Sequence, residues 1–393
     1  MVDSHEIPMR ALLAGARRKE PALLALTRKL VQAESPTGSK AAVDSCVNLV
    51  AAHARPLGGR VKLHRSVAGS RFGAVLEARF GPKAKSAADR VLLLGHLDTV
   101  HPLGALKSMP CRVADGRLYG PGTLDMKAGV AMAFTAIEIL AEAGPLSREI
   151  VLLLNPDEEV GSPASRPITE HLARECSAVY VLEPAQGLAY KTARKGIGDW
   201  RIEVEGVAAH AGVDFLKGAS AILELARAIE TVSGWTGQDA TGSAPGVTVS
   251  VGVIGGGTKS NVIPAQAWAE VDVRFPRRVD GLRIARKFAA LKPVDKRCTI
   301  AITGGINRPP MERTRGTVRL FKKARALAGE LGFVLDEAST GGGSDGNFTS
   351  ALGIPTLDGM GAVGEGAHAR HESVVIEHLA PRTALLAAMI AHS

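Results

Sequence analysis

Two patterns of hydrophobic positions alternate along the first third of the chain: helical spacing and short, continuous apolar runs. The helical segments are residues 23–31, 41–54 and 126–140, and the continuous runs are residues 91–94, 150–154 and 178–182. A continuous apolar run is typical of a strand that is covered on both faces, and helices between such strands indicate a largely parallel sheet. We therefore predict an α/β fold with a mostly parallel sheet.

The pattern changes near Gly196, where strict alternation of apolar and polar residues replaces the continuous runs. Alternation indicates strands with one solvated face, and two segments with helical spacing separate them. The order strand, helix, strand, strand, helix, strand favours a ferredoxin-like α+β open-faced sandwich. Because the buried pattern returns afterwards, we predict an α+β domain at residues 195–304, inserted into a catalytic domain formed by residues 1–194 and 305–393.

Acidic residues and a histidine follow the ends of the predicted buried strands. They are His96 and Asp98 after the first strand, Asp157, Glu158 and Glu159 after the second, Glu183 after the third, and Asp125 at a helix start. The carboxyl ends of parallel strands form the functional crevice of such sheets. A buried charge is costly unless it is paired or bound to a metal. Imidazole and carboxylate ligands together suit catalytic zinc.

The composition narrows the range of partners. The chain has 393 residues, which agrees with two domains, and a net charge of +9, but its basic residues are dispersed. Aromatic residues make up only 4%, too few for a surface that stacks on bases, so we expect no nucleic-acid partner. No apolar run is long enough to span a membrane, no signal sequence is evident, and the four cysteines are far apart. We expect a cytoplasmic protein with reduced thiols.

Eight short motifs stand in a fixed order along the chain. They are GHLDTV, GPGTLDMKAG, NPDEEVGS, VLEP, VAAHAG, GGGTKSNVIPA, TGGGSD and GAHARHE. GHLDTV alone is moderately specific and TGGGSD alone is weak, but the ordered set is highly specific. Over residues 25–392 the set resembles the di-zinc metallopeptidases of the M20 family, and most closely the glutamate carboxypeptidases among them.

The resemblance implies two zinc ions per subunit, with Co²⁺ or Mn²⁺ as alternative metals. Its motifs assign His96 and Glu183 to one ion, Glu159 and His368 to the other, and Asp125 as the bridge between them. His371 competes with His368 for its role. The family pattern places a histidine four residues before a glutamate, and that spacing selects His368.

The resemblance also implies roles around these ligands. Asp98 would orient His96. Glu158 would act as the general base that takes a proton from a water bridging the two metals and later gives it to the leaving amine. A cis peptide bond is expected between Asp125 and Met126. His101 has no counterpart in the family, and we interpret it as a loop residue.

Substrate recognition is expected from the inserted domain and from a glycine-rich loop. Arg274 lies on an alternating strand, and a guanidinium is suited to bidentate capture of a carboxylate. In the resemblance, Arg274 and Asn261 grip the free α-carboxylate of the substrate. The backbone of Gly342 and Gly343 either approaches the substrate closely or forms tight turns.

The resemblance further implies that His210 reaches the active site of a neighbouring subunit, where it stabilises the oxyanion, so a homodimer is expected. The expected function is zinc-dependent hydrolysis of the amide bond to a C-terminal amino acid. The alternative is deacylation of N-acyl amino acids, as in acetylornithine deacetylases and aminoacylases. A non-catalytic binding protein on the same fold would be expected to lack Glu158 or a ligand, and none is missing here.

Overall fold

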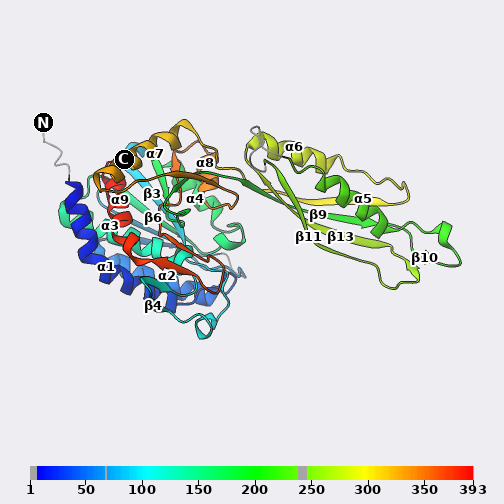
Figure 1. Ribbon diagram of the computed structural model, residues 1–393, viewed down its shortest axis with the longest axis horizontal. Helices are drawn as coiled ribbons and strands as arrows, with labels where there is room; N and C mark the ends of the chain where they lie inside the picture. Colours follow the sequence, from blue (N-terminus) through cyan, green and yellow to red (C-terminus); the bar gives the residue numbers. More distant parts are fainter. Residues whose placement is uncertain (1–6, 67–68, 238–245, 393) are drawn as a thin grey trace. The chain divides into compact units, whose positions relative to one another are not determined.

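The computed structural model describes residues 7–66, 69–237 and 246–392. These residues divide into two compact units, each with its own sheet and hydrophobic core (Figure 1). The first unit lies within Met1–Ala193, Arg313–Ser339 and Ser344–Ser393, and the second within Arg194–Glu312 and Thr340–Gly343. No helix in the described part of the chain combines the length and the apolar character that a bilayer span requires.

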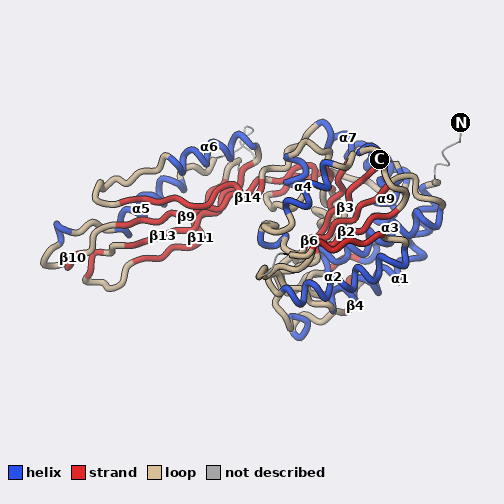
Figure 2. The backbone as a smooth tube through the Cα atoms, turned by 180° about the vertical axis from the view of Figure 1, so that it is seen from behind, coloured by secondary structure: helices blue, strands red, loops and turns tan. Residues whose placement is uncertain are grey.

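A six-stranded sheet forms the centre of the first unit (Figure 2). Its order is β1 (Arg60–His64), β2 (Val75–Phe80), β6 (Glu149–Asn155), β3 (Arg90–His96), β7 (Ala178–Val181) and β16 (Thr356–Leu357). The last four strands in this order are parallel, whereas β1–β2 and β2–β6 are antiparallel pairs. The predicted α/β fold is confirmed, and its sheet is mixed.

Helices cover both faces of this sheet, which explains the continuous apolar runs. In β3, Val91 and Leu93 belong to one core, and Leu92 and Leu94 belong to the core on the opposite face. A strand buried on both faces needs an apolar side chain at every position, so alternation disappears. One face carries α1 (Met9–Gln32), α2 (Lys40–Ala54), α3 (Ala128–Ala143), α7 (Arg315–Glu330) and α9 (Leu379–Ala391), and the other carries α4 (Arg166–Arg174) and α8 (Gly346–Ala351).

Two features of the first unit differ from the sequence-based expectation. Helix α1 begins at Met9 rather than at residue 23 and continues through Pro21, because Leu12 and Ala16 are also buried in the core. A small sheet was not predicted, since its strands of two or three residues are too short to show a period. It joins β17 (Gly364–Glu365), β18 (Ser373–Val375), β5 (Arg117–Tyr119) and β4 (Arg112–Ala114).

The second unit contains an antiparallel sheet with the order β11 (Thr248–Gly256), β13 (Gln266–Phe275), β9 (Gly196–Glu205) and β14 (Thr299–Arg308). Helices α5 (Ala221–Ser233) and α6 (Arg278–Ala289) pack on this sheet. Burial alternates along β9 and β13, so one face of the sheet is buried and the other is more open. Trp200 stacks on Phe288 in the core at 4.6 Å between ring centroids. Two further strands, β8 (Tyr190–Arg194) and β15 (Glu337–Thr340), pair with each other, and all but the last residue of each belongs to the first unit.

The start of α3 lies very close to the chain that follows β7. A Cβ atom at Gly129 would be 2.2 Å from the carbonyl oxygen of Leu182, closer than any side chain tolerates. Gly129 stands four residues after Asp125, and Leu182 immediately precedes Glu183. The glycine therefore permits the approach that brings these two acidic residues into one region of the unit.

We expect Gly129→Ala to lower the free energy of unfolding by about 2–3 kcal/mol, because the added methyl group forces helix and strand apart. Gly329 is the matched control: it lies in α7, is exposed, and has no atom within 4 Å of its Cβ position. Gly329→Ala should raise stability by up to about 1 kcal/mol through helix propensity. Urea unfolding measures both effects, and equal stability of the two variants would contradict this account of the close approach.

Candidate metal centre

His96 stands at the last position of β3, where the buried strand ends at the carboxyl edge of the sheet. Its side chain is buried, with a relative exposure of 1% for the residue. The ring atom Nδ1 lies 3.0 Å from the main-chain oxygen of Asp98 and 3.4 Å from its Oδ1. Asp98 therefore fixes the ring, and Nε2 points the other way, toward Asp125.

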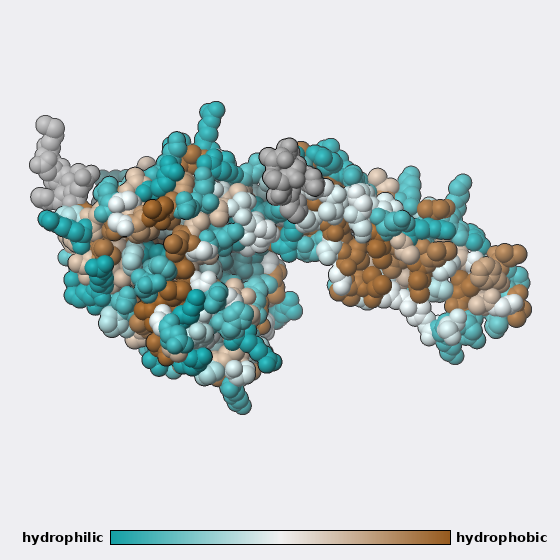
Figure 3. All heavy atoms as spheres, viewed as in Figure 1, coloured by the Kyte–Doolittle hydropathy of each residue, from teal (hydrophilic) through white to brown (hydrophobic). Residues whose placement is uncertain are grey.

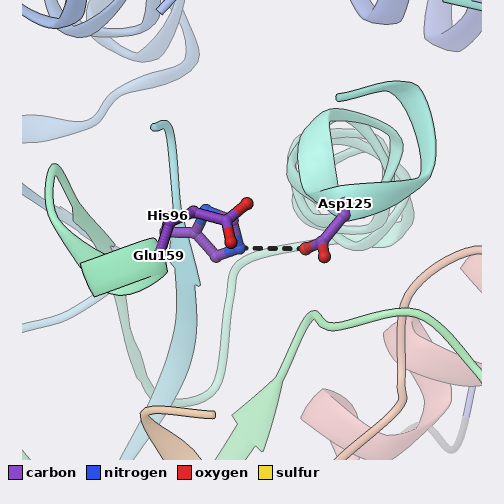
Figure 4. A group of neighbouring side chains, drawn as sticks. All are labelled: His96, Asp125 and Glu159. Atoms are coloured by element: carbon purple, nitrogen blue, oxygen red, sulfur yellow. Dashed lines mark hydrogen bonds and ion pairs between the residues drawn. The ribbon is translucent and has the colours of Figure 1, made fainter. Parts of the chain in front are cut away.

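Asp125 lies in the turn Thr123–Lys127 that leads into α3, and a cis peptide bond joins it to Met126 as expected. Its Oδ1 lies 3.1 Å from His96 Nε2, and its Oδ2 lies 3.2 Å from His368 Nε2. One carboxylate thus faces two imidazoles, one through each oxygen. Figure 4 shows His96, Asp125 and Glu159 converging on the same space.

Two glutamates complete the cluster from neighbouring strand ends. Glu159 follows β6 and places Oε2 3.1 Å from His368 Nε2, while Glu183 follows β7 and places Oε1 3.5 Å from His96 Nε2. The structure therefore brings together the five residues that the motifs suggested as metal ligands. They form two sets that share Asp125: His96 with Glu183, and His368 with Glu159.

The ligand atoms of this cluster are close enough to hold a cation. One ligand atom each from His96, Asp125 and Glu159 lies within 4.8 Å of the other two, and the same is true of His96, Glu158 and Glu183. The oxygen Oε1 of Glu159 is buried and has no hydrogen-bond partner among the described residues. Imidazole nitrogens, carboxylate oxygens and an unsatisfied buried acceptor fit zinc or a similar divalent ion.

The protonation of the two histidines reflects the concentrated negative charge. Burial opposes protonation of His96, but hydrogen bonds with Asp125, Asp98 and Glu183 outweigh it and raise its pKa well above the usual value. Hydrogen bonds with Asp125 and Glu159 raise the pKa of His368 to about 10. The site thus attracts positive charge strongly, which is the electrostatic condition for binding a divalent cation.

His368 has a backbone conformation that is rare for a histidine. It lies between β17 and β18 with φ at +66°, in the left-handed region. Such strain persists only where the surrounding structure imposes it, and it concentrates at functional sites. The small sheet that was not predicted from the sequence thus carries one of the two histidines of the cluster.

Asp98 supports more than His96. Its Oδ1 accepts a hydrogen bond from the backbone N–H of Glu158, and its Oδ2 accepts one from the backbone N–H of Glu159, both at 3.2 Å. The hydroxyl of Thr37 donates to Oδ2 at 2.7 Å. A single buried carboxylate therefore positions the imidazole at the end of β3 and the glutamate pair after β6.

Glu372 is a functional candidate that sequence reasoning missed. Its buried carboxylate accepts hydrogen bonds from the backbone N–H groups of Gly122, Leu124 and Asp125 at 2.8–3.0 Å. His101 Nε2 lies 2.8 Å from its Oε2, so His101 is more than the simple loop residue that we expected. The partners are 271 residues apart in the chain, and only the spacing of His368 and Glu372 in GAHARHE pointed to this residue.

The remaining predicted site residues lie in the second unit. Arg274 on β13 donates to the carboxylate of Asp272 from Nε and Nη2, at 2.7–3.0 Å. His210 is exposed on β10 (Ala209–His210), which pairs with β12 (Val262–Ile263), and its Nδ1 accepts hydrogen bonds from two following backbone N–H groups. The carbonyl of Asn261 accepts from the backbone N–H of Ala211.

Gly342 and Gly343 are held by their carbonyl groups. Both carbonyls accept a hydrogen bond from Arg194 Nη1, at 3.2 and 3.1 Å. A Cβ atom at Gly343 would be 2.6 Å from the side chain of Ile197, so close packing within the second unit requires glycine there. The expectation that these two glycines contact substrate stays a prediction.

A sequence model of peptidase family M20/M25/M40 matches residues 92–392. The chain belongs to this peptidase family. Carboxypeptidase G2 of Pseudomonas sp. (strain RS-16) is 29% identical over 394 residues, which cover 96% of this chain and 91% of that protein. Succinyl-diaminopimelate desuccinylase of Delftia acidovorans is 29% identical over 376 residues, which cover 91% of this chain and 94% of that protein. The M20 protein described here is therefore a hydrolase.

Solved structures share the fold. Aminopeptidase PepT from Bacillus cereus superposes with a TM-score of 0.73 at 23% identity, covering 95% of this chain and 98% of that one. The M20 metallo-carboxypeptidase Sso-CP2 from Sulfolobus solfataricus superposes with a TM-score of 0.70 at 17% identity, covering 94% and 98%. Both likenesses concern the fold and extend over nearly the whole length of each chain.

We expect Glu372→Gln to weaken zinc binding by about 10- to 100-fold, because an amide places N–H groups against the donors that hold the Asp125 turn. Glu365→Gln is the control, since Glu365 is exposed and its side chain pairs with Arg117 at 3.2 Å, away from the Asp125 turn. Zinc titration of metal-free protein against a chromophoric chelator gives both affinities. Unchanged zinc affinity in Glu372→Gln would show that the turn holds its position without this carboxylate.

Proposed function

We propose that the protein is a zinc-dependent hydrolase that cleaves the amide bond to a C-terminal amino acid, as a glutamate carboxypeptidase does. The observation that carries this proposal is the Asp125 carboxylate, which faces His96 through one oxygen and His368 through the other. Similarity to carboxypeptidase G2 over 96% of the chain supports the choice of reaction.

The proposed ligand sets follow the geometry of the cluster. His96 and Glu183 would hold one ion, Glu159 and His368 would hold the second, and Asp125 would contribute to both. Zinc, when bound, lowers the pKa of a coordinated water and polarises the substrate carbonyl. Because its ligands come from the ends of three sheet strands and two loops, the site depends on the whole first unit, which we propose to be the catalytic domain.

Glu158 is the proposed general base. It lies next to Glu159, and its backbone N–H is fixed by Asp98. In the proposed reaction, Glu158 takes a proton from the attacking water while the water oxygen bonds to the amide carbon. The C–N bond then breaks, and the same proton passes to the departing amine nitrogen. The products are a carboxylic acid and an amino acid with a free amino group.

We propose that the second unit binds substrate and forms the homodimer. Arg274 and Asn261 would hold the α-carboxylate, and His210 would stabilise the oxyanion in the partner's active site. The unit offers a surface for a second copy of the chain: exposed apolar side chains gather over α5 and the edge strand β11 (Figure 3). They are Ile222, Leu223, Val253 and Ile254, exposed by 45–64%.

Light scattering should give the mass of two chains, and an active monomer would refute this assembly.

A second candidate function is deacylation of N-acyl amino acids. The similarity to succinyl-diaminopimelate desuccinylase, whose coverage is nearly as complete, supports it. Both reactions hydrolyse an amide beside a carboxylate-bearing amino acid, so the cluster serves either. A panel of N-acyl amino acids and dipeptides separates them: preference for glutamate as the released residue, whatever the acyl group, favours the first function, and preference for succinyl or acetyl groups on other amino acids favours the second.

Adjacent glutamates should respond differently to amide substitution. Glu158→Gln should keep the zinc content of the wild type, but its kcat should fall by at least about 10²- to 10⁴-fold, because only the base is lost. Glu159→Gln should lose zinc, because it removes a charged ligand, and excess zinc should partly restore its activity. Metal analysis and steady-state kinetics of both variants test the assignment. Zinc loss in Glu158→Gln with retention in Glu159→Gln would reverse the two roles.

Arg274→Ala should raise KM about 30- to 1,000-fold, corresponding to about 2–4 kcal/mol for the loss of a desolvated charge-assisted pair. Substrates with an amidated C-terminus should be poor for the wild type. Arg286→Ala is the control, since Arg286 is an exposed arginine on α6 of the same unit. Equal turnover of free-acid and amide substrates by the wild type would rule out recognition of the α-carboxylate.

A further inference from the structure

The first unit contains a cavity of about 300 Å³ that is not part of the candidate metal centre. Its walls come from α1, the loop after β7, the segment that follows α7 and the start of α9. Leu13, Leu188, Phe333 and Val334 make it largely apolar. Leu188 and Val334 are exposed by 52% and 75%, so the cavity opens to solvent between apolar side chains. Its volume lies at the lower end of the range for small-molecule sites.

The ionisable residues that line this cavity are all basic. Arg17, His378 and Arg382 contribute to its wall, and no acidic residue does. Glu377 approaches His378 only at 3.8 Å, and its side chain is 77% exposed. The cavity therefore combines an apolar wall with a positive potential, which is complementary to an anion with an apolar body.

Arg382 is the buried member of the three, with a relative exposure of 3%. Its guanidinium donates to the carbonyls of Gly359, Gly361 and Leu188 at 2.6–3.1 Å and lies over the ring of Tyr190. Within the described residues it forms no ion pair with a carboxylate. The carbonyls satisfy its hydrogen bonds but leave its charge uncompensated, which is costly in a buried position.

We propose that this cavity binds a small amphiphilic carboxylate, with the anionic head toward the basic residues and the aliphatic tail against Leu13 and Phe333. The carboxylate supplies the missing counter-charge for Arg382. A cavity of this size accepts a tail of roughly six to eight carbons, which covers the apolar wall. A neutral ligand leaves the charge of Arg382 uncompensated, and an anion without an apolar tail leaves the apolar side chains of the wall exposed to water.

Isothermal titration of the zinc-loaded protein with octanoate tests this proposal. We expect a Kd between about 10 µM and 1 mM, in keeping with the ligand efficiency of small molecules. Octanamide, which has the same tail without the charge, and inorganic phosphate, which has charge without a tail, should each bind at least about tenfold more weakly. Octanamide or phosphate binding as tightly as octanoate, or no octanoate binding up to several millimolar, would overturn the proposal.

A matched pair of variants separates this cavity from the metal centre, which also attracts carboxylates. Val334→Glu places an acid at the rim, and because Val334 is 75% exposed the fold should tolerate it. Val294→Glu is the control at a position in the second unit that is 69% exposed. Octanoate should bind Val334→Glu at least about tenfold more weakly than the wild type, and it should bind Val294→Glu as the wild type does.

If octanoate binds Val334→Glu as tightly as the wild type, the ligand lies elsewhere and the proposal is overturned. Equal weakening of octanoate binding in Val334→Glu and Val294→Glu would also overturn it. Arg17→Gln should weaken binding as well, whereas Arg10→Gln on the same helix should not, because Arg10 does not line the cavity. Substitution of Arg382 is a poorer test, since it frees three carbonyls in the core.

Discussion

Repulsion among carboxylates governs the arrangement of the first unit at the ends of β3, β6 and β7. Asp125, Glu158, Glu159 and Glu183 are gathered where the sheet ends, and His96 and His368 contribute nitrogen atoms to the cluster. A fold that concentrates like charges in a buried place loses stability unless positive charge enters. The pKa values of both histidines are raised for the same reason, because protonated imidazoles offset the negative charge of the carboxylates. A pair of divalent cations would meet it more fully, which is why the cluster fits a metal centre better than a structural ion-pair network.

The parts of the fold around the cluster hold these charges in place. Glu372 holds the turn that contains Asp125, and Gly129 lets the following helix approach the segment before Glu183. The backbone N–H of Gly361 donates to the carbonyl of Glu183, and Arg382 in turn binds the carbonyl of Gly361. The cavity proposed for an amphiphilic carboxylate therefore shares Arg382 with the support of a proposed metal ligand. Hydrogen bonds to backbone groups, rather than contacts between side chains, carry most of this support.

The sequence predicted the sheet and most of the cluster because both leave local signals. Every position of Val91–His96 is buried, so the apolar run in the sequence reflects a strand that is covered on both faces. The acids that end such runs are conspicuous for the same reason. The contact between Glu372 and His101 left no local signal, since both residues are polar loop residues 271 positions apart, and the GAHARHE spacing marked Glu372 without showing its role. The ion pair between Asp272 and Arg274 could have been predicted from the sequence, because residues two apart on a strand share a face.

Asp98 links the two chemical tasks that the proposed mechanism assigns to separate residues. Its carbonyl and carboxylate oxygens contact His96, a proposed metal ligand, while its two carboxylate oxygens accept from the N–H groups of Glu158 and Glu159. A shift of this one carboxylate would therefore move a ligand of each metal set and the proposed base together. In the proposed mechanism, metal binding and proton transfer would thus be coupled through the backbone of a short turn. The proposed coupling gives a physical reason why GHLDTV and NPDEEVGS must meet in one register, so that Glu159 can serve as the proposed ligand and Glu158 as the proposed base.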